Sequence, residues 1–211
     1  YLVNFYGSFI SSKGKIKHQD YAQFDAKATG SVFTKSNEIY GSASMGRQDY
    51  LLYGYDHNVY DYKKSDVKQQ LQDITIRAGI RNTNVTDYRI SYNPSVEFNV
   101  FTNIGKLNET TFIIDAPVEK KIGESFSIKL AARADLTNYF TKGFIPDNYN
   151  FNNTVVQVSP AIVYNSGLVK IHAGITPTWS NSKFEFLPNG YAEVKKKEKI
   201  FMIQAGWIGK Y

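Results

Sequence analysis

Hydrophobic and polar residues alternate along most of this chain, and the alternation is longest at residues 88–101. In this segment, YRISYNPSVEFNVF, one set of alternate positions holds Ile90, Tyr92, Pro94, Val96, Phe98 and Val100, and the other set is polar or charged. Alternation places every second side chain on the same face of a β-strand, so the segment predicts a strand with one apolar and one polar face. Soluble strands are usually about 5–6 residues long, whereas a tilted strand that crosses a bilayer needs about 9–11. We therefore expect a membrane-spanning strand here.

Ten further segments have the same pattern. We expect strands at residues 2–12, 21–33, 39–45, 71–81, 112–118, 126–136, 156–164, 169–179, 184–194 and 200–209, which makes eleven in all. The connections are mostly longer after odd-numbered strands, as in bacterial barrels with long outer loops and short periplasmic turns. The predicted fold is therefore all-β, an antiparallel transmembrane β-barrel. No run of residues is apolar for long enough to form a membrane-spanning helix.

The odd strand number has a consequence for the domain organisation. Unpaired terminal strands are not tolerated in lipid, because their backbone groups find no hydrogen-bond partner there. We therefore expect residues 1–211 to be one outer-membrane barrel segment, incomplete at both ends, of a barrel with roughly 14 or more strands. Five prolines inside the predicted strands weigh against a regular ladder and favour bulges or shifted boundaries at some of them. They are Pro94, Pro117, Pro160, Pro177 and Pro188.

The alternation assigns side chains to two environments. Those expected to face lipid are Ile90, Tyr92, Val96, Phe98, Val100, Phe126, Ile128, Leu130, Val156, Val158 and Ile162. The charged residues expected to face the lumen are Asp25, Lys27, Arg77, Glu97, Asp115, Lys129, Arg133 and Asp135. These charges could line a selective pore. Charges of opposite sign on neighbouring strands favour the other interpretation, a mutually paired interior that seals the barrel.

Aromatic residues are unusually frequent, with 16 Tyr, 14 Phe and 2 Trp making up 15% of the chain. Aromatic belts at the two membrane interfaces would account for them, although such rings could also stack on sugars or bases. The residues expected at the interfaces are Tyr50, Tyr53, Tyr55, Tyr139, Phe140, Trp179 and Trp207. Two Tyr-rich segments, residues 50–70 and 138–152, are expected to be loops.

Enzymatic, cofactor and nucleic-acid functions have little support in the sequence. The chain has no cysteine and only three scattered histidines, so we expect no disulfide, metal site or cofactor. His57 follows Asp56, but adjacent side chains point apart and no nucleophile is spaced to join them, so we expect no enzyme. The net charge of +6 is spread through strands and loops rather than gathered in a stripe, which argues against nucleic acid. Lysine runs at 63–64 and 195–197 could bind lipopolysaccharide phosphates or be solvated turn charges.

Several segments resemble a known family. They are SSKGKIK (11–17), YLLYGYD (50–56), VSPAIVY (158–164), GLVKIHAGITPTW (167–179) and FEFLPNGYAEV (184–194). They are similar to strands and loops of a family of Bacteroidetes outer-membrane β-barrels described as TonB-dependent receptor-like. The resemblance implies a location in the outer membrane of a Gram-negative bacterium and further strands outside this chain. No plug domain or energy-coupling box is evident, and the resemblance supplies no catalytic residue.

The function expected from these observations is that of an integral, non-enzymatic outer-membrane barrel, acting as a subunit of a larger envelope assembly or as a passive barrel. The alternative is a transport barrel, a porin or receptor that moves a small solute through its lumen. An envelope enzyme would require Ser, Asp and His to converge at the rim, and a soluble carbohydrate-binding sandwich would require the apolar faces to pack on each other. The expected partners are membrane lipid, lipopolysaccharide and other outer-membrane or periplasmic proteins.

Overall fold

The chain forms one antiparallel β-sheet in a computed structural model that describes residues 1–105, 107–141, 149–196 and 201–209. The prediction of an all-β antiparallel fold is confirmed, and the described residues contain no helix. Accordingly, no helical segment among them has the length and apolar character needed to span a bilayer. The strands are β1 (Leu2–Lys13), β2 (Asp20–Phe33), β3 (Asn37–Leu51), β4 (Lys68–Asn82), β5 (Ile90–Tyr92), β6 (Ser95–Asn103), β7 (Leu107–Ile122), β8 (Phe126–Thr141), β9 (Tyr149–Asn165), β10 (Val169–Ser180), β11 (Lys183–Lys196) and β12 (Phe201–Ile208).

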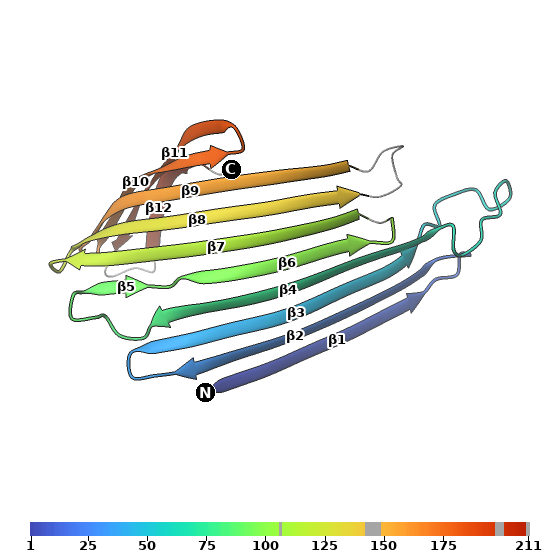
Figure 1. Cartoon of the computed structure of the whole chain (residues 1–211), viewed down its shortest axis with the longest axis horizontal. Coiled ribbons are helices and arrows are strands. Elements are labelled where there is room, and N and C mark those ends of the chain that lie inside the picture. The colour runs from blue at the N-terminus through green and yellow to red at the C-terminus, as the bar shows by residue number, and fades with distance from the viewer. Residues whose placement is uncertain (106, 142–148, 197–200, 210–211) are drawn as a thin grey trace.

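The strands follow one another across the sheet in sequence order, and β5 and β6 both pair with β7 (Figure 1). These two strands are the halves of the strand predicted at residues 88–101. Asn93 and Pro94 separate them opposite Pro117, where two prolines remove ladder donors from neighbouring strands. The other four prolines that weighed against a regular ladder lie within strands β7, β9, β10 and β11.

Several strands are longer than the alternation of apolar residues indicated. β3 continues to Leu51, and residues 138–141 and 149–152, predicted as loop, belong to β8 and β9; residues 142–148 lie outside the described residues. Asn138 shows the reason, because its Nδ2 donates to the Oδ1 atoms of Asn150 and Asn152 at 2.7 Å each. Cross-strand amide bonds thus extend the pairing beyond the apolar part of each strand.

The connections lie along two opposite edges of the sheet. One edge, here called the loop edge, carries the segments after β1, β3, β6, β8 and β10, including the 52–67 connection between β3 and β4 (Figure 1). The other, the turn edge, carries residues 34–36, 83–89, 123–125 and 166–168. The connections after β1, β3 and β8 are longer than the turns at 34–36, 123–125 and 166–168, as predicted, but the turn-edge connection 83–89 is as long as the one after β8. The predicted difference in length fails after β6 and β10, whose connections are residues 104–106 and 181–182.

The ladder registers define two faces. Residues that pair directly share a face, so one row across the sheet runs Ala78, Val96, Ile114, Ala134, Val156, and an adjacent row runs Arg77, Glu97, Ile113, Asp135, Val155. We call the face with the first row the apolar face and the face with the second the polar face. All eleven residues predicted to face lipid lie on the apolar face, and all eight predicted lumen charges lie on the polar face.

In a soluble protein the apolar face of a sheet is the buried one, whereas here the polar face is more buried than the apolar face. Apart from Leu51 and Val67 at the loop edge, every buried side chain among the described residues lies on the polar face, including Glu38 and Thr178. The apolar face leaves large side chains exposed, among them Phe126 at 52%. A single sheet buries side chains where curvature brings them together, so the polar face is the concave one. Figure 1 shows this curl, as β10, β11 and β12 turn out of the plane of β1 to β9.

The sheet is open between its two edge strands. Among the described residues, β1 pairs only with β2, and β12 pairs only with β11. Most side chains of β1 and all of those of β12 are exposed on both faces for that reason. The described residues therefore form a curved sheet that is not closed into a barrel.

Candidate functional site

The polar face gathers the charged residues that the alternation selected. One group of contacts lies near the turn edge of β7 and β8. Lys129 Nζ is 3.2 Å from Glu119 Oε2, and Ser127 Oγ donates to Glu119 Oε1 at 2.6 Å. Glu119 and Lys129 are directly opposite in the ladder, which fixes this pair through backbone register.

A second network crosses the same face toward the loop edge. Arg133 Nη2 lies 4.0 Å from Asp135 Oδ2, and the hydroxyl of Thr137 donates to Asp135 Oδ1 at 3.0 Å. Thr137 Oγ1 is in turn 3.1 Å from the hydroxyl of Thr111 on β7. On β9 and β10, Gln157 Nε2 donates to Thr178 Oγ1 at 3.3 Å. Polar side chains on neighbouring strands thus satisfy one another, as buried polar groups require.

Other predicted charges have neutral partners or none in hydrogen-bond range. Arg77 is opposite Glu97, yet its Nη2 donates to Ser95 Oγ at 3.2 Å. Asp25 accepts from Ser8 Oγ at 3.3 Å and from Gln23 Nε2 at 2.7 Å. For Lys27, Glu97 and Asp115 no ion pair within 4.0 Å is found among the described residues.

The most buried charge on the polar face was missed by the sequence analysis. Glu38 accepts from Arg81 Nε at 2.7 Å and from Ser31 Oγ at 2.7 Å, and Arg81 also lies 5.7 Å from the centre of the Tyr40 ring. The Arg81 guanidinium beside Glu38 lies at the turn edge, where β2, β3 and β4 pair. Extending the alternation of residues 39–45 by one position would have placed Glu38 on the same face as Tyr40.

Six of the seven predicted interface aromatics lie at the loop edge. Tyr50, Tyr139, Phe140 and Trp179 are within the last three residues of β3, β8 and β10, which end at that edge. Tyr53 and Tyr55 follow in the 52–67 connection. Trp207 is near the end of β12 but lies opposite Gly190, in the middle of β11. These six residues therefore mark a single edge of the sheet rather than two.

The histidines at the loop edge pack among tyrosines. His18 Nδ1 is 2.7 Å from the Tyr55 hydroxyl, and the His57 ring lies 4.2 Å from the Tyr55 ring. His57 Nε2 is 3.2 Å from the carbonyl oxygen of Tyr53, while Asp56 Oδ1 accepts from the backbone N–H of Asn58. His57 and Asp56 thus bind separate backbone groups rather than each other.

An ion pair joins the two connections that carry these histidines. Lys17 Nζ lies 2.5 Å from Asp61 Oδ1, and this hydrogen bond and charge hold the pKa of the Asp61 carboxyl below its usual value. The β1–β2 and β3–β4 connections are thereby tied together at neutral pH. The third histidine, His172, lies on the polar face of β10 and stacks on Tyr191 at 4.9 Å.

Chemically, the polar face offers hydrogen-bonded hydroxyls, amides and matched charges. Among the described residues, no group of three or more His, Asp or Glu side chains is placed to hold a metal ion. Comparison of the chain with models of protein families and with curated proteins gives no match.

Proposed function

We propose that this chain is part of an integral outer-membrane β-barrel without enzymatic activity, serving as a subunit of a larger envelope assembly or as a passive barrel. One observation carries the proposal: in a single sheet, the concave face is polar and the convex face is apolar and exposed. An uncovered apolar surface of this extent is unstable in water but suits hydrocarbon. The strands, most of them 12 residues or longer, exceed the about 9–11 residues that a tilted bilayer crossing needs.

Barrel closure is part of this proposal. In hydrocarbon the free backbone groups of β1 and β12 would lack partners, which makes an open sheet edge very unfavourable. Further strands would supply those partners, giving a barrel of roughly 14 or more strands. The resemblance to the TonB-dependent receptor-like barrels of Bacteroidetes agrees with this arrangement and with an outer-membrane location in a Gram-negative bacterium. Partners would be membrane lipid, lipopolysaccharide and other envelope proteins, with no role for nucleic acid.

Single-cysteine labelling tests the membrane placement; residues 1–211 contain no cysteine, and any cysteine elsewhere in the complete protein is first replaced by serine so that each label is unique. Cysteine at Val96, Glu97, Phe98 or Asn99 would carry a fluorophore in the complete protein reconstituted into vesicles. We expect a lipid-attached quencher to act on positions 96 and 98 and to leave 97 and 99 bright, because successive side chains of β6 face opposite environments. Equal quenching at all four positions, or none at any, would contradict the proposal.

A selective transport barrel is the second candidate. Lys27, Glu97 and Asp115 on the concave face have no ion-pair partner in the described part of the chain, which favours it, since rings of free charge set ion selectivity. The pairs Glu119–Lys129 and Arg133–Asp135 favour the passive role, because matched charges leave little net field for a permeating ion.

Planar-bilayer recording separates these two candidates. We expect the reconstituted complete protein to show no long-lived open channel, because its polar face is largely hydrogen-bonded to itself. Stable unitary currents that shift their ion selectivity in a Glu97→Gln variant would instead support the transport barrel.

A further inference from the structure

The apolar face ends at the loop edge in a group of charged residues. On β3 the alternate positions change from Met45 to Arg47 and Asp49, and on β4 the same face carries Gln70 and Lys68. Arg47 is opposite Phe24, so the charges begin directly beside the apolar surface. This is the position at which a bilayer would change from hydrocarbon to headgroups.

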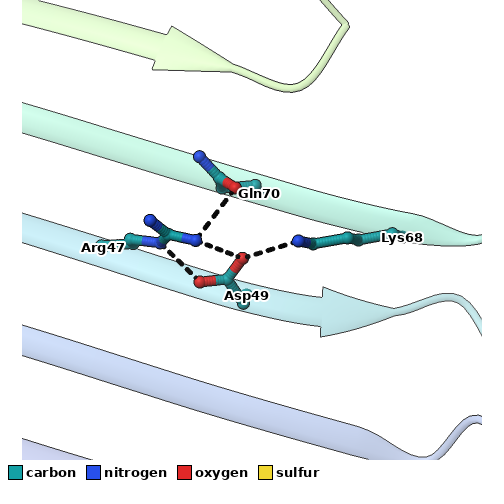
Figure 2. A network of polar contacts seen from close by, with 4 residues as sticks. All are labelled: Arg47, Asp49, Lys68 and Gln70. Carbon is teal, nitrogen blue, oxygen red and sulfur yellow. Dashed lines mark hydrogen bonds and ion pairs between the residues drawn. The ribbon is translucent and has the colours of Figure 1, made fainter. Parts of the chain in front are cut away.

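These residues are held together by a defined network (Figure 2). Arg47 Nε donates to Asp49 Oδ2 at 2.6 Å, and its Nη2 donates to Gln70 Oε1 at 3.1 Å. Lys68 Nζ lies 3.6 Å from the other oxygen of Asp49. The guanidinium is therefore fixed in orientation between β3 and β4.

The network lines a cavity of about 730 Å³, which we call the basic rim pocket. Its charged lining residues are Lys13, Asp20, Arg47, Asp49, Lys64 and Lys68. Lys64 Nζ pairs with Asp20 Oδ2 at 2.9 Å, and the Asp49 carboxylate forms ion pairs with both Arg47 and Lys68. Four cations against two carboxylates leave an excess of two positive charges, with Ser11, Ser12 and Ser65 adding hydroxyl groups.

We propose that the basic rim pocket binds a phosphate group on the headgroup of an outer-leaflet lipid whose acyl chains lie on the apolar face. This inference rests on the proposed membrane placement and adds a specific lipid site to it. A phosphate monoester carries between one and two negative charges and accepts several hydrogen bonds, which matches the excess charge and the free ammonium donors. The adjoining apolar surface at Phe24 would hold the lipid tail, which free phosphate lacks.

Lipid titration tests this site. The complete protein in detergent is titrated with diphosphorylated lipid A, with the same lipid after enzymatic dephosphorylation, and with inorganic phosphate, and bound species are counted by native mass spectrometry. The variant Lys13→Gln/Lys68→Gln keeps the Arg47–Asp49 and Lys64–Asp20 pairs. We expect it to bind the phosphorylated lipid at least about tenfold more weakly than the parent, since two charge-assisted contacts are lost.

The matched control is Lys35→Gln/Lys120→Gln, which removes the same charge at the turn edge. We expect this control variant to bind the phosphorylated lipid as tightly as the parent does. We also expect the parent to bind the dephosphorylated lipid only as weakly as the Lys13→Gln/Lys68→Gln variant binds the phosphorylated lipid. An equal loss of lipid affinity in both variants, or no loss of affinity in either, would overturn the proposed site. Inorganic phosphate binding as tightly as the lipid would show a free-anion site and overturn the lipid assignment. If cysteine quenching alternates along β6 but these affinities do not differ, only the lipid site fails.

Discussion

Replacing Ile114 with lysine should destabilise the protein in a bilayer by about 2–4 kcal/mol, the penalty for a lysine on the lipid face of a barrel near the bilayer midplane. Ile114 is 40% exposed and lies on the apolar face between Val96 and Ala134. Its new ammonium would have no charged partner on that row. Urea unfolding in vesicles, followed by the fluorescence of Trp179 and Trp207, measures the change.

The preceding residue provides a matched control, since Ile113 is the same amino acid on the opposite face of the same strand. Ile113 is directly opposite Glu97 and Asp135, so Ile113→Lys places an ammonium between two carboxylates. We expect the stability of this variant to lie within about 0.5 kcal/mol of the parent or above it. Asn108→Lys, at the loop edge of the apolar face, should lower the stability of the protein in the bilayer by only about 0–1 kcal/mol. An Ile114 variant as stable as the parent would show that the apolar face does not meet hydrocarbon.

The faces of the sheet could be predicted from the sequence because strand geometry has a fixed period. Knowing that Phe98 follows Glu97 is enough to place them on opposite faces, and the predicted strands appear in the order and number expected once β5 and β6 are joined. Alternation carries no information on curvature, however. The burial of Glu38 and Thr178 on the polar face depends on the curl of the sheet, which no local pattern specifies.

The basic rim pocket illustrates a second limit. The sequence predicts a strand at 39–45 and a loop at 50–70, although Arg47 and Asp49 continue the apolar-face positions of Met45 with charged residues. β3 retains its alternation beyond Met45 but changes its chemistry from apolar to charged, so its end cannot be found by a search for apolar residues. Only the register of β3 with β4 brings Arg47, Lys68 and Gln70 together.

We expect the curl to depend on a close approach between β9 and β10. Their ladder runs from Lys170 opposite Asn165 to Gly174 opposite Ala161, stops, and resumes at Thr178 opposite Gln157. Pro160 and Pro177 lie in the gap, where each lacks a backbone donor. Gly174 stands at the border of this gap, on the concave face, and Figure 1 shows β10 turning away from the plane of the preceding strands.

Gly174→Val should therefore destabilise the fold by about 1–3 kcal/mol through overpacking. A Cβ at position 174 would lie 2.7 Å from the carbonyl oxygen of Pro160 and 2.7 Å from the Cβ of Ala161, so backbone must move to admit it. The matched control is Gly190→Val on the neighbouring strand, where the nearest atom to a new Cβ is the His172 carbonyl oxygen at an ordinary 3.6 Å. We expect the free energy of unfolding of the control, measured in the same urea titration, to lie within about 0.5 kcal/mol of that of the parent. Equal stability of the two variants would mean that β9 and β10 have room to separate, and that the concave polar face does not depend on this contact.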